Sequence, residues 1–272
     1  MSTVTVDAPA RSEVRSGLTF GGVLHSEWIK LRSVRSSGLT LLAAALMMIV
    51  TGLIFAATFG SDSDGANGVT DPTGVTLTGA MFAQLVVGVL GVLTVSSEYS
   101  TGMIRSTLTG VPSRLPVLAG KVAVVVGAVF PVMLATAFAV FLGGQALMSG
   151  NGHPSAAVGD PGVLAALVGS AATMSGVAVI GVALGSVLRN TAGAISTLVA
   201  VMFLVPGLGS LVLPASWRDD VLRFLPSNAS DAFVSVAPGP NLLGAPAGAA
   251  VFAVWVVVPL VVAAVLLRRR DA

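Results

Sequence analysis

The sequence predicts an all-α integral membrane protein with six transmembrane helices, and three observations support this fold class. The chain of 272 residues is 54% apolar and only 10% charged, whereas soluble domains carry about 25% charged residues. Six stretches of at least 21 residues contain no charged side chain, and a helix needs about 20 apolar residues to cross the hydrocarbon layer. These stretches are 39–59, 75–95, 122–148, 162–188, 191–213 and 247–267.

The third observation is the distribution of charge between the stretches. If the N-terminus is cytoplasmic, twelve of the fourteen Lys and Arg residues lie on the inner side, and only Arg218 and Arg223 lie outside. The outer side holds seven acids: Asp62, Asp64, Asp71, Asp160, Asp219, Asp220 and Asp231. This asymmetry follows the positive-inside rule. We therefore expect a multi-pass protein of the cell (plasma) membrane with both termini in the cytoplasm.

The sequence indicates one transmembrane domain at 18–272, preceded by a disordered cytoplasmic tail at 1–17. The tail is polar and lacks the apolar core of a signal peptide. The sequence pI is about 9.7, but the basic residues lie next to the ends of the spans, where they face anionic lipid. Nucleic acid is therefore not an expected partner.

An interfacial helix is predicted at 18–36, before the first span. Its apolar residues recur at helical spacing: Phe20, Leu24, Trp28 and Leu31. Its basic residues are interleaved with them: Lys30, Arg32 and Arg35. This pattern is typical of a helix that lies in the membrane interface, with Trp28 at the level of the headgroups. Gly38 is expected to provide the turn into the first span, and a solvated tail is the alternative interpretation.

A cytoplasmic coupling helix is predicted between the second and third spans. Glu98 and Arg105 are seven residues apart, so a helix would place both on one face. Ile104 and Leu108 form an apolar pair four residues apart. A simple connector would need only a few residues, so the length of this segment favours a docking element over an ordinary solvated loop.

Three segments resemble motifs of the type-2 ABC transporter permeases, the exporter-type membrane subunits with six helices. The family's coupling region is similar to Glu98-Tyr99-x-x-Gly102-x-Ile104-Arg105-x-x-Leu108, followed by Pro112-x-Arg114 and Lys121. Its amphipathic connecting helix resembles Glu27-Trp28-x-Lys30-Leu31-x-Ser33. Its extracellular helix resembles the segment from Leu213-Pro214-x-x-Trp217 through Leu225-Pro226. One departure is Met103, where many relatives carry Thr.

The resemblance implies that two permease protomers form the translocation path and that a separate ABC-type ATPase drives it. The residues expected to couple to the ATPase are Glu98, Tyr99, Gly102, Arg105 and Leu108. The residues expected at the membrane interface are Trp28, Lys30, Arg32 and Arg35. The expected partners are the ATPase subunit, a second protomer in a homodimer or heterodimer, and the lipid bilayer.

The chain itself is not expected to be an enzyme or to bind a cofactor. Leu115 stands where a P-loop before Lys121 would need its first Gly, and Val122 stands where it would need Ser or Thr. His25 and His153 are predicted on opposite sides of the membrane, so they cannot form one metal site or one catalytic pair. The sequence contains no cysteine.

None of the predicted spans contains an ionisable residue, whereas ion-coupled transporters usually place the coupling charge within the membrane. Gln84 and Gln145 are the strongest polar residues in the spans, and hydrogen bonding between helices is favoured for both. The Gly181–Gly185 pair predicts close helix packing, with dimerisation a possibility. Pro206 is expected to kink or break the fifth span.

The leading function is therefore the membrane subunit of an ATP-driven exporter. The alternatives are a non-transporting membrane scaffold and an ion-coupled secondary transporter. A highly charged substrate would find no partner in the spans, so an amphipathic or largely apolar substrate is favoured. A short outer helix at 216–225 either gates or seals the outer face.

Overall fold

The computed structural model of the chain describes residues 19–58, 71–103, 114–237, 239 and 241–269. The predicted tail at 1–17 lies outside this range. All regular elements in the described ranges are helices, and six are long and apolar enough to cross a membrane, as predicted. These are α2 (Arg35–Thr58), α4 (Ala80–Ser100), α6 (Arg114–Gly150), α7 (Val163–Leu188), the helix from Thr191 to Val212, and α12 (Ala245–Arg269).

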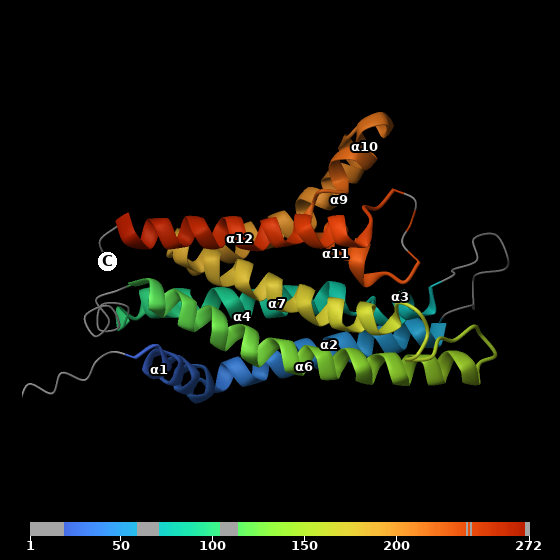
Figure 1. Cartoon of the computed structure of the whole chain (residues 1–272), viewed down its shortest axis with the longest axis horizontal. Coiled ribbons are helices and arrows are strands. Elements are labelled where there is room, and N and C mark those ends of the chain that lie inside the picture. The colour runs from blue at the N-terminus through green and yellow to red at the C-terminus, as the bar shows by residue number, and fades with distance from the viewer. Residues whose placement is uncertain (1–18, 59–70, 104–113, 238, 240, 270–272) are drawn as a thin grey trace, which may run out of the picture.

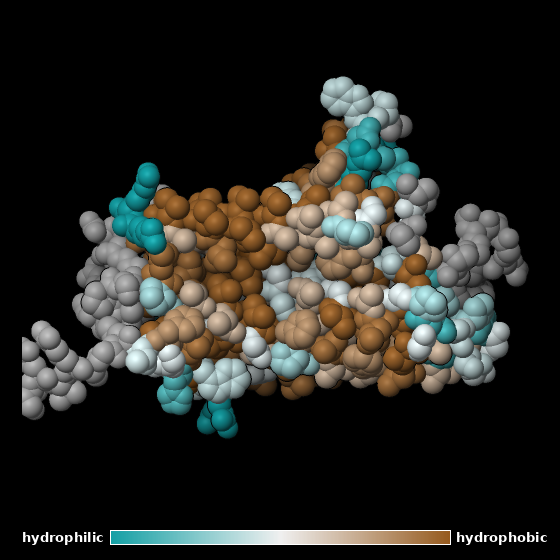
Figure 2. All heavy atoms as spheres, in the orientation of Figure 1, coloured by the Kyte–Doolittle hydropathy of each residue, from teal (hydrophilic) through white to brown (hydrophobic). Residues whose placement is uncertain are grey.

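Successive long helices run in opposite directions along one bundle (Figure 1). We call the end that carries α1 (Phe20–Ser33) the α1 end, and the end that carries α3 (Pro72–Leu77) the α3 end. Apolar residues cover most of the middle of the visible face, and hydrophilic residues gather toward both ends (Figure 2). This distribution matches the six candidate spans.

The central element of the bundle is α7, which packs against α4, α6, α11 (Pro226–Val234) and α12. Glycines allow α4 and α7 to approach closely. A Cβ atom on Gly181 would collide with the carbonyl oxygen of Gly88, and one on Gly91 would collide with the carbonyl oxygen of Ala178. The Gly181–Gly185 pair therefore mediates helix packing within the chain, which was the favoured interpretation.

The chain turns between α1 and α2 at Val34, and not at Gly38 as the sequence predicts. Val34 has an extended backbone (φ −84°, ψ 101°), and its N–H is donated to the Lys30 carbonyl. Gly38 lies inside α2. The expectation was wrong because one extended residue is enough to end a helix, and a glycine with helical dihedral angles can remain within one.

A break precedes the second long helix, where the sequence predicted one continuous span at 75–95. Asp71 caps α3 by accepting a hydrogen bond from Gly74 N (2.9 Å), and Pro72 occupies the first turn. The chain then passes Thr78 and Gly79 before α4 begins. A Cβ atom on Gly79 would collide with the Met48 carbonyl, so glycine allows this junction to lie against α2.

At its other end α4 stops within the segment where the coupling helix was predicted. The helix ends at Ser100, and Gly102 has a φ of +72°, a left-handed conformation that suits glycine. The helix that carries Glu98 therefore ends before residue 105, and a shared face for Glu98 and Arg105 stays a prediction. Residues 104–113, which include Arg105 and Leu108, lie outside the described range, so the coupling helix itself stays a prediction.

The fifth span is interrupted, as Pro206 predicted. It consists of α8 (Thr191–Val199), a π turn (Ala200–Leu204) and α9 (Val205–Val212). Proline clashes with the carbonyl four residues before it, and a π turn relieves such a clash by widening the helix. Accordingly, Val205 N donates to the carbonyl of Ala200, five residues back.

The outer helix predicted at 216–225 corresponds to α10 (Ala215–Leu222), and α11 follows it. Together α9 and α10 project from the side of the bundle (Figure 1). Trp217 on α10 is 67% exposed. The two helices contact each other where Leu222 packs over Gly209.

Candidate functional site

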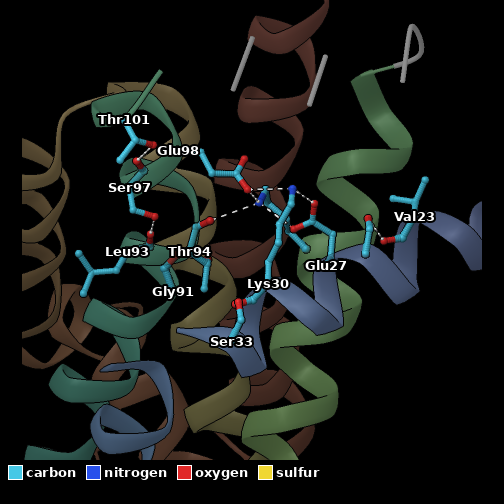
Figure 3. Close-up of polar contacts among 12 residues, drawn as sticks. Val23, Glu27, Lys30, Ser33, Gly91, Leu93, Thr94, Ser97, Glu98 and Thr101 are labelled. Carbon is cyan, nitrogen blue, oxygen red and sulfur yellow. Dashed lines mark hydrogen bonds and ion pairs between the residues drawn. The ribbon is translucent and has the colours of Figure 1, made fainter. Parts of the chain in front are cut away.

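Four charged side chains meet inside the bundle at the α1 end. They come from three helices: Glu27 and Lys30 from α1, Glu98 from α4, and Lys121 from α6. Figure 3 shows the carboxylates of Glu27 and Glu98 directed toward the amine of Lys30. We call these four residues the ion ring, because each amine contacts both carboxylates.

The distances in the ion ring are those of direct ion pairs. Lys30 Nζ lies 2.7 Å from Glu27 Oε1 and 3.1 Å from Glu98 Oε1. Lys121 Nζ lies 2.8 Å from Glu27 Oε2 and 2.6 Å from Glu98 Oε1. Lys121 also donates to the carbonyl oxygen of Thr94 (3.3 Å). Two acids face two bases, so the ring is neutral overall.

The local sequence explains how α1 brings two charges to this position. Thr19 caps the helix by accepting a hydrogen bond from Gly22 N (3.3 Å). Val23, Glu27 and Lys30 are spaced by four and three residues, so they share one face. That face packs on α6, where a Cβ atom on Gly120 would lie 3.0 Å from Val23. The absence of a side chain at Gly120 lets α1 lie against α6.

Burial determines the energetics of the ion ring. Glu27, Glu98 and Lys121 are each at most 5% exposed, whereas the Lys30 side chain is 31% exposed. Buried charges are stable only when paired, and removal of one partner leaves an uncompensated charge. Burial acts to lower the pKa of Lys30, but the hydrogen bond and charge of Glu27 and the charge of Glu98 outweigh it and raise this pKa.

A small cavity of about 170 Å³ borders the ion ring. Leu31 and Val34 line it from α1 and its C-cap, Thr40 lines it from α2, and Ser97 and Met103 line it from the end of α4 and the residues after it. The second carboxylate oxygen of Glu98, Oε2, is buried and has no hydrogen-bond partner among the described residues. The ring is therefore neutral and well paired, but not every polar atom in it is satisfied.

Tyr99 extends the site to the turn between α7 and α8. The guanidinium carbon of Arg189 lies 5.2 Å from the centre of the Tyr99 ring, which is cation–π geometry. Arg189 caps α7 in a left-handed conformation (φ 53°), and Asn190 then caps α8 by accepting from Gly193 N (2.9 Å). The last turn of α4 thus contacts the start of the fifth span.

The predicted ATPase-coupling residues that the structure describes lie in three different environments. Glu98 is buried in the ion ring, Tyr99 contacts Arg189, and Gly102 lies just after α4 with a left-handed backbone. Arg105 and Leu108 lie outside the described residues. Their structural relation to the ion ring stays a prediction.

The predicted interface residues also divide into two groups. Trp28 is 44% exposed, and Arg32 and Arg35 are exposed. Lys30 instead turns into the ion ring. Because Lys30 follows Glu27 by three residues, its side chain lies on the buried face and not on the face of Trp28.

Sequence reasoning did not assign Glu27 and Lys121 to the site, although both belong to the motifs quoted above. For each residue, the surrounding sequence contained a pattern that indicates a buried charge. Glu27 has the apolar Val23 four residues before it and the opposite charge of Lys30 three residues after it. Lys121 stands directly before a long apolar stretch, so a helix extended by one turn buries its charge.

Gln145 acts as the sequence favoured, as a hydrogen-bonding residue between segments. Its amide donates to the carbonyl of Pro72 (3.0 Å) and accepts from Ala156 N (2.8 Å). It therefore connects α6 to the start of α3 and to the segment before α7. No group of three or more His, Cys, Asp or Glu residues suited to a metal ion occurs in the described part of the chain.

Six helices that are long and apolar enough to cross a membrane define a multi-pass membrane protein. The family model described as "ABC-2 family transporter protein" matches residues 23–207. The match covers well over half of the chain and includes all four ion-ring residues, and the chain belongs to this family. Its members generally lack the ATPase domain, and membership implies an ATPase partner. No curated protein matches the chain.

Proposed function

We propose that the chain is the permease subunit of an ATP-driven exporter in the cell membrane. A second permease protomer completes the translocation path, and a separate ABC-type ATPase subunit binds at the α1 end. The family match over residues 23–207 is the observation that carries this proposal. The outward direction of transport follows from the resemblance to the exporter-type permeases.

Charge supports a cytoplasmic α1 end. The described basic residues at that end outside the ion ring are Arg32, Arg35, Arg114, Arg189, Arg268 and Arg269. The described acids toward the other end are Asp71, Asp160, Asp219, Asp220 and Asp231. The positive-inside rule places the first group in the cytoplasm, on the side where an ATPase can bind.

The ion ring is suited to transmit force from the ATPase. Residues 101–113 connect α4 to α6, and the ring holds these two helices together through Glu98 and Lys121. In our proposal Arg105 and Leu108 contact the ATPase, while Glu98 acts indirectly because its carboxylate is buried. A displacement of the connecting segment then moves α4 and α6 as one unit, together with α1.

The contact between Tyr99 and Arg189 carries this motion further. It joins the end of α4 to the turn before α8. In this proposal the fifth span therefore moves together with the second. In the proposed assembly α1 lies in the membrane interface, with Trp28, Arg32 and Arg35 toward the lipid headgroups. The exposed apolar faces of α12 and of the fifth span are available to lipid and to the second protomer.

The first test is copurification. The chain is expressed with a candidate ABC-type ATPase, the membrane fraction is solubilised, and the permease is captured by affinity tag. We expect the ATPase to elute with the permease and its hydrolysis to depend on the presence of the permease. A permease that captures no ATPase and stimulates no hydrolysis would support the scaffold interpretation.

The second test separates the two transport mechanisms. The complex is reconstituted in liposomes, and uptake of an amphipathic fluorescent dye is followed with ATP or with a proton gradient. We expect the dye to enter the liposomes only when ATP and the ATPase are present, through complexes whose cytoplasmic side faces outward. Transport driven by the gradient in the absence of ATPase would establish the ion-coupled alternative.

A further inference from the structure

A second cavity, of about 530 Å³, lies toward the α3 end. Its walls come from α3, α4, α7, the π turn with the start of α9, and α11. This volume is within the range of about 300–1,000 Å³ that is typical of small-molecule sites. The cavity lies in one protomer and is distinct from the ion ring, which is at the opposite end of α4.

One part of the wall is polar. Gln84 on α4 is 7% exposed, and Ser170 and Thr173 on α7 are almost fully buried. The hydroxyl oxygens of Ser170 and Thr173 have no hydrogen-bond partner among the described residues. Buried polar groups are normally paired, so unpaired ones at a cavity wall indicate a place where a ligand can supply the partner.

The same cavity contains one charged group among its described lining residues. Asp231 on α11 is exposed and is the only ionisable residue among the described residues that line the cavity. Although part of Asp231 is exposed, desolvation by the residues packed around it raises its pKa to about 6. No base lies among the described residues that line the cavity, so Asp231 gives it a negative potential that favours a cation.

Asp71 holds the residues that follow α11 in position. Its Oδ2 accepts from the Ser235 hydroxyl (3.0 Å), from Val236 N (3.1 Å) and from Ala237 N (3.4 Å), while its Oδ1 accepts from Gly74 N. These bonds join the start of α3 to the residues that follow α11. Asp71 therefore has a structural role, and Asp231 is the acid that remains for a ligand.

The remaining wall is apolar and adaptable. It contains Met81, Met174, Met202 and Phe203. Methionine side chains are flexible and polarizable, so they fit apolar groups of several shapes. The combination of one acid with a methionine-rich wall selects a ligand with a single positive charge and an apolar body.

We propose that this cavity binds amphipathic organic monocations, with Asp231 as the counter-charge and α4, α7 and the π turn around the apolar body. The assignment of such cations as transported substrates rests on the proposed function. The binding itself is a property of the permease alone, so it is tested without the ATPase.

The test compares two ions of the same shape and opposite charge, tetraphenylphosphonium and tetraphenylborate. Binding to the purified full-length permease in detergent is measured by equilibrium dialysis against protein-free micelles. We expect tighter binding of tetraphenylphosphonium than of tetraphenylborate. Asp231→Asn should weaken tetraphenylphosphonium binding by about tenfold or more, because one charge contact is lost. Equal binding of the two ions, or unchanged binding to the variant, would overturn the proposal.

Two matched variants complete the dialysis experiment. Asp231→Glu keeps the charge and should retain binding. Asp220→Asn removes an exposed acid of α10 that does not line the cavity, and it should bind as the unaltered protein does. Weakened binding in Asp220→Asn equal to that in Asp231→Asn would show a general effect of charge and contradict the assignment.

A labelling experiment leaves Asp231 intact and does not depend on the folding of its variants. Ser227 lines the cavity and the chain has no cysteine, so Ser227→Cys provides a single thiol at the wall. Tetraphenylphosphonium should slow the reaction of this thiol with a maleimide, and tetraphenylborate should not. A thiol at the exposed Ser216 is the control. Absence of protection at position 227 would refute binding in this cavity while leaving the ATPase proposal intact.

Discussion

Lys121 on α6 donates to Glu98 on α4 across 2.6 Å, and both side chains are at most 5% exposed. The connecting residues 101–113 lie between these two helices in the sequence. The two ends of this connection are thus joined by a buried ion pair. Any force on the connection acts on helices that are already coupled.

The first prediction concerns the stability of the ion ring. Lys121→Met leaves two buried acids with one base, and loss of one partner from a buried pair costs about 3–5 kcal/mol. We expect a clearly lower melting temperature of the purified permease in detergent. Lys121→Arg keeps the charge, so its melting temperature should fall less. The double variant Glu98→Gln/Lys121→Met restores a neutral ion ring and should have a higher melting temperature than Lys121→Met. A wild-type melting temperature for Lys121→Met would contradict the prediction.

The positions of these charges show what the sequence could and could not predict. The six spans follow from length and apolarity alone, because each stretch is long enough to cross the membrane. The ion ring depends on where helices end and how they pack. Apolarity alone predicts that the second span ends at Val95 and the third begins at Val122, whereas α4 continues to Ser100 and α6 begins at Arg114. These extensions bring Glu98 and Lys121 into the packed bundle.

The second prediction concerns the connecting segment. Arg105→Glu reverses a charge that we expect at the ATPase surface, so the variant should insert normally but lose ATPase capture and stimulated hydrolysis. Arg268→Glu makes the same charge change at the end of α12 and serves as the control. Retention of both activities by Arg105→Glu would favour an ordinary solvated loop at this position.

The third prediction concerns the close contact of α4 and α7. Gly91→Ala places a Cβ atom against the Ala178 carbonyl, so the helices must separate and the melting temperature should fall. Gly127 on α6 has open space around it, and Gly127→Ala should be neutral or stabilising, since alanine favours a helix by about 1 kcal/mol. Equal melting temperatures for the two variants would argue against the packing described here.

The fourth prediction tests whether α1 lies in the membrane interface. With Trp217 and Trp255 replaced by Phe, the fluorescence of Trp28 reports on its surroundings alone. We expect quenching by lipids brominated near the headgroup, because the indole is exposed from the protein and suits the interface. Quenching only by a water-soluble agent would instead indicate that this face of α1 is in water.

The fifth prediction concerns pH. The pKa of Asp231 in the folded protein is about 6, above its ordinary value of 3.8, so folding takes up a proton between these two values. The contribution of this group to stability therefore falls as pH rises from about 4 to about 6. Asp231→Asn, which cannot ionise, should gain melting temperature relative to the unaltered protein at about pH 7.5 and little at about pH 4.

The neighbours of Asp231 make this prediction specific. The π turn and α7 carry no charged residue, and α12 carries only Arg268 and Arg269, at its opposite end. Asp71 is bonded to the residues that follow α11, and its oxygens accept four hydrogen bonds. A pH-independent difference between Asp231→Asn and the unaltered protein would assign the titration to another group.

The break in the fifth span could be predicted from Pro206, but its form could not. A kink, a helix end and a π turn all relieve the same clash, and packing decides among them. Likewise, Gly38 is of a residue type that is common in turns, yet the turn occurs at Val34. Local sequence thus indicates that a helix is perturbed, whereas neighbouring helices determine where and how.

The π turn has a consequence for the orientation of everything after it. It accommodates one more residue than an α-helical turn, and each residue of an α-helix corresponds to a rotation of about 100°. Leu198 and Met202 are buried, whereas Val205, which would continue their face in a regular helix, is exposed, and Pro206 takes its place at the cavity. The surplus residue therefore acts as a rotational offset that decides which side chains of the fifth span face the protein and which face its surroundings.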